Sequence, residues 1–175
     1  MSGPPELVLF DRDGTLVRDF PYNGDPAWIR PMDGARAALD RLRAHGVRLG
    51  VTTNQSGVAR GLITRAQVEA CNARLAELLG PFDTVQVCPH GPDDDCVCRK
   101  PAPGMVLTAC AELGIDPARC VVIGDVAADV QSATAAGAVG ILVPTPVTRR
   151  QEVEAAARRA DDLAQAVDDV LAGRW

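Results

Sequence analysis

The sequence predicts an α/β protein with a doubly wound, Rossmann-like parallel sheet of about five strands. Short apolar segments alternate with helix-like segments along the chain, which is the pattern of repeated strand–helix–strand units. The apolar segments are continuous rather than alternating, as expected for strands that helices cover on both faces. Polar residues cluster directly after four of these segments. In such sheets the carboxyl ends of the strands hold the binding site, so we expect functional residues there.

Five short apolar runs are expected to form the strands. They cover residues 7–10, 47–53, 84–88, 120–124 and 139–143. The run Pro144-Thr145-Pro146 follows the last of them, and proline cannot continue a central strand because it lacks the backbone donor.

Four helices are expected between the strands, each followed or capped by a residue that favours a helix end. They cover residues 33–45, 64–79, 104–113 and 127–136. Gly46, Gly114 and Gly137 follow three of them as stop signals, and Thr64 is expected to cap the start of the second. The tail over residues 149–171 is helical by composition, with a break expected near Asp161.

The composition is that of an ordinary globular protein, with 47% hydrophobic and 23% charged residues. The length of 175 residues fits one domain over residues 1–175. A net charge of −5 and an aromatic content of 3% disfavour nucleic-acid binding, which needs a basic surface and exposed rings. No apolar run reaches the ~18 residues of a membrane helix, and the start of the chain does not resemble a signal peptide. We therefore expect a cytoplasmic protein with reduced cysteines and no membrane partner.

Two carboxylates follow the first expected strand, in the run Asp11-Arg12-Asp13-Gly14-Thr15. Residues two apart in an extended segment point to the same side, and Gly14 permits a tight turn directly after them. One carboxylate could attack phosphorus while the other protonates the leaving oxygen. Because Asp and Gly are also common in loops after strands, this run alone leaves an ordinary loop open.

Side chains at three other strand ends suit phosphoryl chemistry. Asp125 follows the fourth strand, and with Asp11 and a backbone carbonyl it would supply the oxygen ligands that magnesium prefers. Thr53, with Asn54 after it, offers a hydroxyl and backbone amides to phosphate oxygens. Lys100 brings a compact positive charge that could offset the charge of a phosphoryl group.

Together these residues resemble the four signature motifs of the haloacid dehalogenase-like phosphatases. The motifs are Asp11-x-Asp13-Gly14-Thr15, Thr53-Asn54, Lys100-Pro101 and Gly124-Asp125-x3-Asp129, and they occur in the family's order over nearly the whole chain. The resemblance implies that Asp11 is the nucleophile and that Asp13 is the general acid and then the base. It also implies that Thr53 and Lys100 bind the phosphoryl group. Magnesium would be held by Asp11, Asp125 and the main-chain carbonyl of Asp13.

Asp129 allows two interpretations. In the family it would hold Lys100 or a water on the metal, but a carboxylate in the first turn of a helix is also favoured by the helix dipole. The spans from Asp13 to Thr53 and from Thr53 to Lys100 are each used by a helix, a strand and short loops. They leave no room for a cap domain, so specificity is expected to come from loops.

Four soft or borderline metal ligands lie within eleven residues, at Cys88, His90, Cys96 and Cys98. They form a complete tetrahedral zinc set with no open position, which predicts a structural zinc ion. The alternative is a loop of inert thiols. Because Arg99 and Lys100 follow the last cysteine directly, the metal would hold both residues at the site.

The resemblance narrows at the loops, where the sequence is similar to the subfamily of the heptose-1,7-bisphosphate 7-phosphatases and the histidinol-phosphatases. It implies a heptose bisphosphate as the substrate, with histidinol phosphate as the alternative. The loop residues expected to contact the substrate are Asp19, Tyr22, Asn54, Gln55, Ser56, Arg60 and Arg99. Of these, Arg99 is suited to grip a second anionic group by a bidentate contact.

Several alternatives stay open. Val17 and Val126 stand where asparagine and lysine are usual in the heptose enzymes, and the short loop between His90 and Cys96 is closer to the histidinol-phosphatases. A phosphotransferase is disfavoured because excluding water usually needs a closing lid. A nucleic-acid end phosphatase is disfavoured by the charge, and a non-enzymatic zinc-stabilised interaction module by the intact acidic set. We expect a monomer that acts on a small phosphorylated metabolite.

Overall fold

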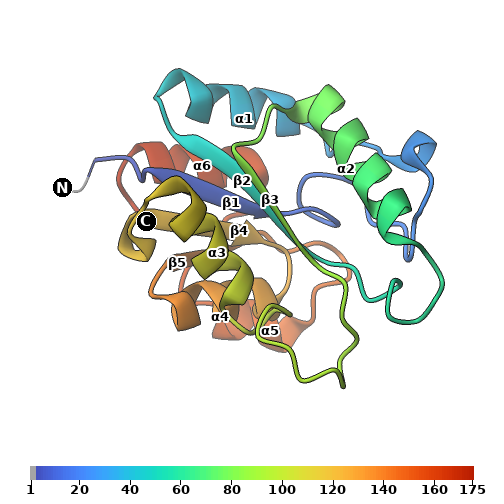
Figure 1. Ribbon diagram of the computed structural model, residues 1–175. Helices are drawn as coiled ribbons and strands as arrows, with labels where there is room; N and C mark the ends of the chain where they lie inside the picture. The colour runs from blue at the N-terminus through green and yellow to red at the C-terminus, as the bar shows by residue number, and fades with distance from the viewer. Residues whose placement is uncertain (1–2) are drawn as a thin grey trace.

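The computed structural model describes residues 3–175 and contains the predicted parallel sheet (Figure 1). Its five strands stand in the order β3-β2-β1-β4-β5 and all pairs are parallel. Their bounds are β1 Leu7–Asp11, β2 Arg48–Asn54, β3 Thr84–Cys88, β4 Cys120–Gly124 and β5 Val139–Leu142. Because β1 lies between β2 and β4, the carboxyl ends of these three strands meet at one edge of the sheet.

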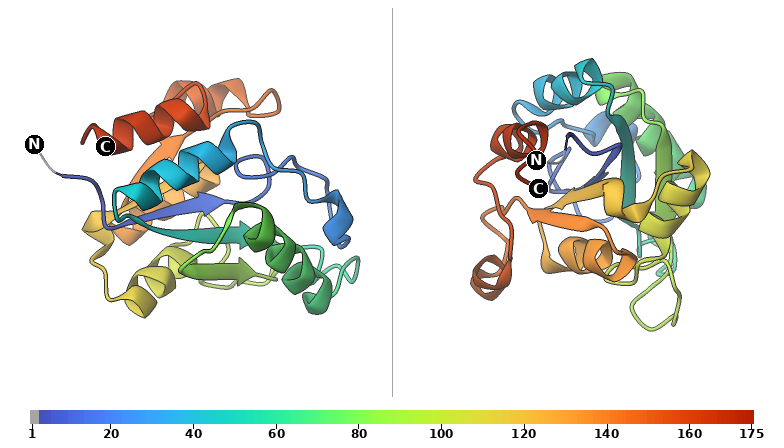
Figure 2. Two further views of the ribbon diagram at one scale, coloured as in Figure 1. Left: turned by 90° about the horizontal axis from the view of Figure 1, so that it is seen from above. Right: turned by 90° about the vertical axis from the view of Figure 1, so that its left-hand side faces the viewer.

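Helices cover both faces of the sheet, as the end-on view in Figure 2 shows. They are α1 Ala35–Ala44, α2 Arg65–Leu79, α3 Gly104–Leu113, α4 Ala127–Ala136, α5 Arg150–Ala155 and α6 Leu163–Leu171. Two short 3-10 helices, η1 Pro26–Trp28 and η2 Pro117–Arg119, lie in the connections. Helices α1, α2 and α6 pack on one face, and α3 and α4 pack on the other.

The side chains of β1 serve both faces of the sheet. Val8 and Phe10 belong to the apolar cluster beneath α1, α2 and α6, whereas Leu7 and Leu9 belong to the cluster beneath α3 and α4. All four are fully buried. Because strand side chains alternate between faces, a strand that is buried on both sides must be continuously apolar, as predicted. Burying each of these side chains contributes about 1.5–3 kcal/mol.

The helix ends follow the predicted signals with small shifts. Thr64 caps α2 as predicted: its Oγ1 accepts from the Gln67 backbone nitrogen at 3.2 Å, and Gln67 Oε1 accepts from the Thr64 nitrogen at 2.8 Å. Helix α1 begins at Ala35, two residues later than predicted. Gly34 before it has a φ of 78°, which lies outside the helical region.

The C-terminal helix breaks earlier than predicted. Instead of continuing to Asp161, α5 ends at Ala155. The next residues run beside β5, where the Leu142 nitrogen donates to the Arg158 carbonyl at 3.0 Å and the Ala160 nitrogen donates to the Leu142 carbonyl at 2.9 Å. The backbone groups that pair with β5 are not available for hydrogen bonds within a helix. Pairing with the edge strand therefore prevails over the helical preference of this segment's residues.

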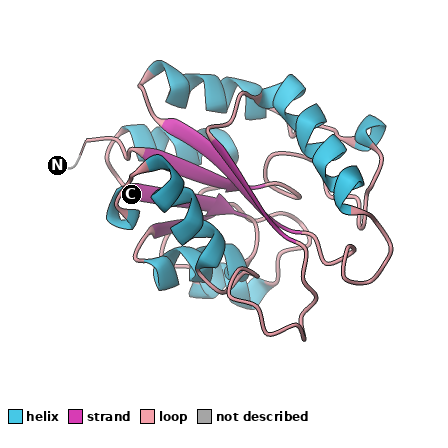
Figure 3. Ribbon diagram, viewed as in Figure 1, coloured by secondary structure: helices cyan, strands magenta, loops and turns pink. Residues whose placement is uncertain are grey.

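The connections after β1, β2 and β3 are loops, as the colouring by secondary structure shows (Figure 3). No cap domain is inserted between the elements over residues 3–175, in agreement with the prediction. In the same range, every helix is too short or too polar to cross a membrane.

Candidate active site

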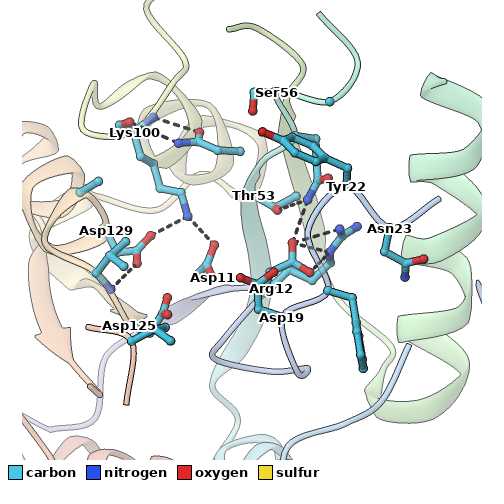
Figure 4. A pocket seen from close by; sticks show the side chains of 18 residues that line it. Asp11, Arg12, Asp19, Tyr22, Asn23, Thr53, Ser56, Lys100, Asp125 and Asp129 are labelled. Carbon is cyan, nitrogen blue, oxygen red and sulfur yellow. Dashed lines mark hydrogen bonds and ion pairs between the residues drawn. The ribbon is translucent and has the colours of Figure 1, made fainter. Parts of the chain in front are cut away.

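A cavity of about 280 Å³ lies at the carboxyl ends of β1, β2 and β4 (Figure 4). It stands where the strand order predicted a site. Its lining residues are Asp11, Arg12, Asp13, Asp19, Phe20, Tyr22, Asn23, Thr53, Asn54, Gln55, Ser56, Gly57, Lys100, Asp125, Val126, Ala128, Asp129 and Val147. The residues of all four sequence motifs are therefore brought together around one space.

A buried ammonium group lies in the wall of this cavity. Lys100 Nζ donates to Asp11 Oδ1 at 2.7 Å, to Asp129 Oδ1 at 2.6 Å and to the Thr52 carbonyl at 2.9 Å. Only 5% of Lys100 is exposed. Burial by itself would lower the pKa of Lys100, but the charges of Asp11 and Asp129 outweigh it and raise the pKa above its ordinary value. The lysine is therefore a fixed positive charge beside Asp11.

Asp129 fulfils both roles that the sequence left open. Its Oδ1 accepts from Lys100, and its Oδ2 accepts from the Val126 backbone nitrogen at 3.2 Å at the start of α4. Only 1% of Asp129 is exposed. Its side chain lies against Gly124, where a Cβ atom would be 2.3 Å from Asp129 Oδ2. The absence of a side chain at Gly124 therefore makes room for the carboxylate that holds Lys100.

We expect Gly124→Ala to damage the site through Asp129. The new methyl group would displace the Asp129 carboxylate and loosen Lys100. We expect turnover to fall by roughly 10²-fold, the cost of a misplaced catalytic group, and the free energy of unfolding to fall by about 1–3 kcal/mol. Phosphate release and chemical denaturation measure the two effects. Gly3→Ala is the control, because nothing lies within 4 Å of a Cβ there. A Gly124→Ala protein with normal turnover would contradict this account.

Three carboxylates could hold a cation beside Lys100. Oxygens of Asp11, Asp125 and Asp129 lie within 4.8 Å of one another. Burial raises the pKa of Asp125 to about 7, and the Asp129 charge adds to the rise. Burial also raises the pKa of Asp11, against the opposing effect of Lys100. A cation between these oxygens would relieve the repulsion of like charges, and an all-oxygen donor set fits a hard divalent ion.

The second carboxylate of the first motif is held on the other side of the cavity. Asp13 pairs with Arg12, whose Nη2 lies 3.0 Å from Asp13 Oδ2. Gln55 Nε2 donates to the same Asp13 oxygen at 2.8 Å and to Thr53 Oγ1 at 2.8 Å. Asp11 and Asp13 thus have separate cationic partners, so the two carboxylates stand in different environments.

The predicted loop residues are divided between the cavity and its surroundings. Asp19, Tyr22, Gln55 and Ser56 line the cavity. Asn54 also lines it, but its side chain binds the backbone of Lys100: Oδ1 accepts from the Lys100 nitrogen at 3.1 Å, and Nδ2 donates to the Lys100 carbonyl at 3.2 Å. Asn54 therefore holds the loop that carries the lysine.

The two predicted loop arginines lie outside the cavity lining. The Arg60 guanidinium stacks over the Tyr22 ring, 5.6 Å from its centroid, so it reaches the cavity only through that ring. Arg99 Nη1 donates to the His90 carbonyl at 3.2 Å. Arg99 is thus bonded to the backbone of the Cys/His loop, and its contact with substrate stays a prediction.

The Cys/His cluster is assembled in the loop after β3. One ligand atom from each of Cys88, His90, Cys96 and Cys98 lies within 4.8 Å of the others. The sulfur–sulfur distances are 3.7 Å for Cys88–Cys96, 3.6 Å for Cys96–Cys98 and 3.2 Å for Cys88–Cys98. A tetrahedral site with metal–sulfur bonds of about 2.3 Å has edges of about 3.8 Å. Two of the three distances are close to this edge and the third is shorter, so the cluster is a compact group of ligands of roughly the size of a closed tetrahedral metal site.

Sequence reasoning missed several residues of the cavity. Arg12 lies between the two motif aspartates, and that position was a signal that it would share their turn. Phe20 lies between Asp19 and Tyr22, which were both expected at the site, whereas Asn23, Ala128 and Val147 come from a loop or helix start whose course has no sequence signal. Val147 is 79% exposed at the cavity mouth.

The central strand of the parallel sheet ends at Asp11, Asp13 follows it, and a buried lysine joins Asp11 to Asp129. This combination of fold and site is typical of the haloacid dehalogenase-like phosphatases. The chain belongs to this family. The HAD-hydrolase-like family model matches residues 97–170. A relative from Bordetella bronchiseptica, D-glycero-beta-D-manno-heptose-1,7-bisphosphate 7-phosphatase, is 35% identical over 177 residues, which covers 95% of this chain and 98% of the relative. The enzyme of the same name from Pseudomonas aeruginosa is 39% identical over 145 residues, covering 79% of this chain and 81% of that one.

A solved structure agrees with these relatives. The crystal structure of D,D-heptose 1,7-bisphosphate phosphatase from Bordetella bronchiseptica, complexed with magnesium and phosphate, matches with a TM-score of 0.84 at 32% identity. The match covers 96% of this chain and 99% of that chain. The predicted family and the predicted fold class are confirmed.

Proposed function

We propose that this chain is a magnesium-dependent phosphatase that removes one phosphate from a heptose bisphosphate through a phospho-aspartate intermediate on Asp11. The observation that carries the proposal is the contact of the buried Lys100 ammonium with Asp11 at 2.7 Å, beside Asp125 and opposite Asp13 in one cavity. The heptose substrate is supported by the names of the relatives. Magnesium is supported by the Bordetella structure, which holds magnesium and phosphate.

In the first step an Asp11 carboxylate oxygen attacks phosphorus and forms a new P–O bond. The bond from phosphorus to the sugar oxygen breaks, and that oxygen keeps the electron pair and takes a proton from Asp13. Lys100 offsets the negative charge of the phosphoryl oxygens at its fixed position, and the Thr53 hydroxyl binds one of them.

In the second step a water oxygen attacks the same phosphorus. Asp13, now a carboxylate, takes a proton from this water, and the bond from phosphorus to Asp11 breaks. The products are inorganic phosphate and a free Asp11 carboxylate, and Asp13 has regained the proton that it gave away. Both steps therefore use the same two carboxylates in alternate roles.

The residues that would hold magnesium are Asp11, Asp125 and the main-chain carbonyl of Asp13. Gly14 supports the third ligand, because it has a φ of 89° and a Cβ there would lie 2.4 Å from Asp125 Oδ2. The turn after Asp13 therefore brings the backbone against the Asp125 carboxylate. When bound, magnesium would supply positive charge to the phosphoryl oxygens.

A phosphate-release assay with and without magnesium tests this proposal. We expect release from heptose 1,7-bisphosphate to exceed release from histidinol phosphate and from a simple hexose phosphate. Chelation should abolish release and added magnesium should restore it in the same sample, because Asp11 and Asp125 repel each other without a cation. Full activity in a sample shown to lack divalent metal would refute the magnesium requirement. Failure to release phosphate from any phosphomonoester would refute the phosphatase.

Histidinol phosphate is the alternative that one feature of the cavity favours. In the part of the chain that the structure describes, the cationic lining residues are Arg12 and Lys100, and both already bind carboxylates. Val126 lines the cavity where the heptose enzymes usually have lysine. Arg99 binds the His90 carbonyl. A monophosphate would need no additional cation, so faster release from histidinol phosphate in the same assay would assign the alternative.

We also propose that the Cys/His cluster binds one structural zinc ion. Three thiols and an imidazole fill a tetrahedral shell, so no water can be activated there. The Arg99 nitrogen donates to Cys96 Sγ at 3.4 Å, which ties the cluster to the residue before Lys100. Loss of the metal should therefore loosen the loop that presents the lysine.

Metal analysis of the purified protein should find one zinc per chain. We expect Cys96→Ser to lower the zinc content and to lower turnover and substrate affinity together, while far-UV circular dichroism shows a folded sheet. Cys110→Ala is the control, because Cys110 is a buried thiol of α3 outside the cluster, and it should keep its zinc. A fully active preparation without zinc and with an ordered loop would show the assignment to be wrong.

A further inference from the structure

The general acid is connected to helix α2 by a chain of side-chain hydrogen bonds. Arg12 Nε lies 3.2 Å from Asp13 Oδ1 and 3.1 Å from Oδ2, and Arg12 Nη2 lies 3.0 Å from Oδ2. From the other edge of the guanidinium, Arg12 Nη1 donates to Asn72 Oδ1 at 2.9 Å. Asn72 is sixty residues from Arg12 in the sequence, so this contact joins the turn after β1 to α2.

We propose that Asn72 is a positioning residue that fixes, through Arg12, the direction in which Asp13 presents its carboxyl group to the leaving oxygen. The inference rests on the proposed phosphatase function, because it assigns Asn72 to the proton transfer of that reaction. Neither the sequence motifs nor the cavity lining includes Asn72.

The geometry of arginine explains how a distant amide could set this direction. The guanidinium is a rigid planar fork, so a contact at one edge fixes the orientation of the other edge. The side chain of Arg12 is 2% exposed, so water molecules have little access to its N–H groups. If Asn72 lost its acceptor oxygen, Nη1 would be left unpaired in a buried place, which is unfavourable. The Arg12 guanidinium would then rotate toward another acceptor, and the Asp13 carboxylate bonded to it would rotate as well.

A second contact limits how far Asp13 can compensate. Gln55 Nε2 donates to Asp13 Oδ2 at 2.8 Å and to Thr53 Oγ1 at 2.8 Å. Asp13 is therefore held between Gln55, which also bonds to Thr53, and Arg12, which also bonds to Asn72 of α2. Loss of the contact between Arg12 and Asn72 should misdirect the Asp13 carboxyl group, while its bond to Gln55 keeps it in the cavity.

The leaving group of the substrate distinguishes this role from a general structural one. A sugar alkoxide is a poor leaving group, so it needs a well-aimed proton from Asp13, and general acid catalysis is worth roughly 10²–10⁴-fold in rate. A p-nitrophenolate ion leaves without protonation. A misdirected Asp13 should therefore slow the first step with a sugar phosphate and spare the first step with p-nitrophenyl phosphate. The first step is measured in a single turnover, because the later attack of water uses Asp13 as base with either substrate.

The test compares Asn72→Leu, which removes the acceptor at similar volume, with Asn72→Asp, which keeps an acceptor oxygen for Arg12. Glu69→Leu is the matched control, because it places leucine at an exposed position of the same helix. For Asn72→Leu we expect the single-turnover rate of sugar release from the sugar phosphate to fall by roughly 10–100-fold. The single-turnover rate of nitrophenolate release from p-nitrophenyl phosphate should fall by less than about threefold, which also shows that the variant is folded. Asn72→Asp should restore most of the loss, and Glu69→Leu should match the wild type.

Two results would overturn the inference alone: equal losses in the single-turnover rate of the first step with both substrates, or no loss with either, in a protein whose wild type is active. Failure of Asn72→Asp to restore turnover on the sugar phosphate would also overturn it. A wild-type protein that hydrolyses neither substrate would refute the proposed function, and the role of Asn72 with it.

Discussion

Asp11→Asn should fold normally and lose at least about 10³-fold in turnover, because an amide cannot attack phosphorus in place of a carboxylate. Asp11 stands at the end of β1 with its Oδ1 atom 2.7 Å from Lys100 Nζ. Asparagine has nearly the same shape and keeps an oxygen for this contact. The sheet should therefore be intact while the chemistry stops.

The measurement is steady-state phosphate release together with the free energy of unfolding. Wild-type protein quenched during turnover should carry a covalently bound phosphoryl group, and Asp11→Asn should not. Near-normal turnover in a folded Asp11→Asn protein would remove the phospho-aspartate from the mechanism and leave direct attack by water as the simplest replacement.

Lys100→Met should lower both turnover and stability. Methionine has a similar length and suits a buried site, but it leaves the carboxylates of Asp11 and Asp129 without their cation. Breaking a buried ion pair from one side typically costs 3–5 kcal/mol, so we expect a loss of about that size in the free energy of unfolding. Removing a positive group that offsets transition-state charge should lower turnover by roughly 10²–10³-fold.

A second substitution separates these two effects. In Lys100→Met with Asp129→Asn, one of the two unpaired charges is removed, so the free energy of unfolding should recover in part. Turnover should not recover, because no positive charge faces the phosphoryl group. Recovery of turnover in the double variant would show that Lys100 acts only by balancing buried charge.

The strand ends could be predicted from sequence because they depend on local signals. Asp11, Thr53 and Asp125 each lie at the end of a predicted strand. Neighbouring parallel strands bring these ends to one edge of the sheet, independently of the conformation of the loops. The residues alone place Asp129 at a helix start. Its contact with Lys100 was one of two roles implied by the family resemblance, because that contact depends on the fold of a distant loop. Single-domain organisation, a monomeric state and a cytoplasmic location remain predictions from the sequence.

The partners of the loop side chains could not be predicted, because polar groups compete for them in three dimensions. Asn54 is expected to contact the substrate and lines the cavity, but its bonds to both backbone groups of Lys100 could not be foreseen. The guanidinium of Arg99 satisfies the His90 carbonyl. In both cases the sequence identifies a suitable functional group, but only the folded loop decides which of several acceptors or donors lies within reach.

The central place of β1 has a consequence for local opening of the protein. Its backbone is paired on both sides, with β2 and β4, and its side chains lie in both apolar clusters. Amide hydrogens in such a strand exchange with solvent only when most of the molecule unfolds, whereas loops and edge segments exchange through smaller fluctuations. Asp11 is thus attached to the segment that opens last. The loops that line the cavity can therefore fluctuate while Asp11 stays in place.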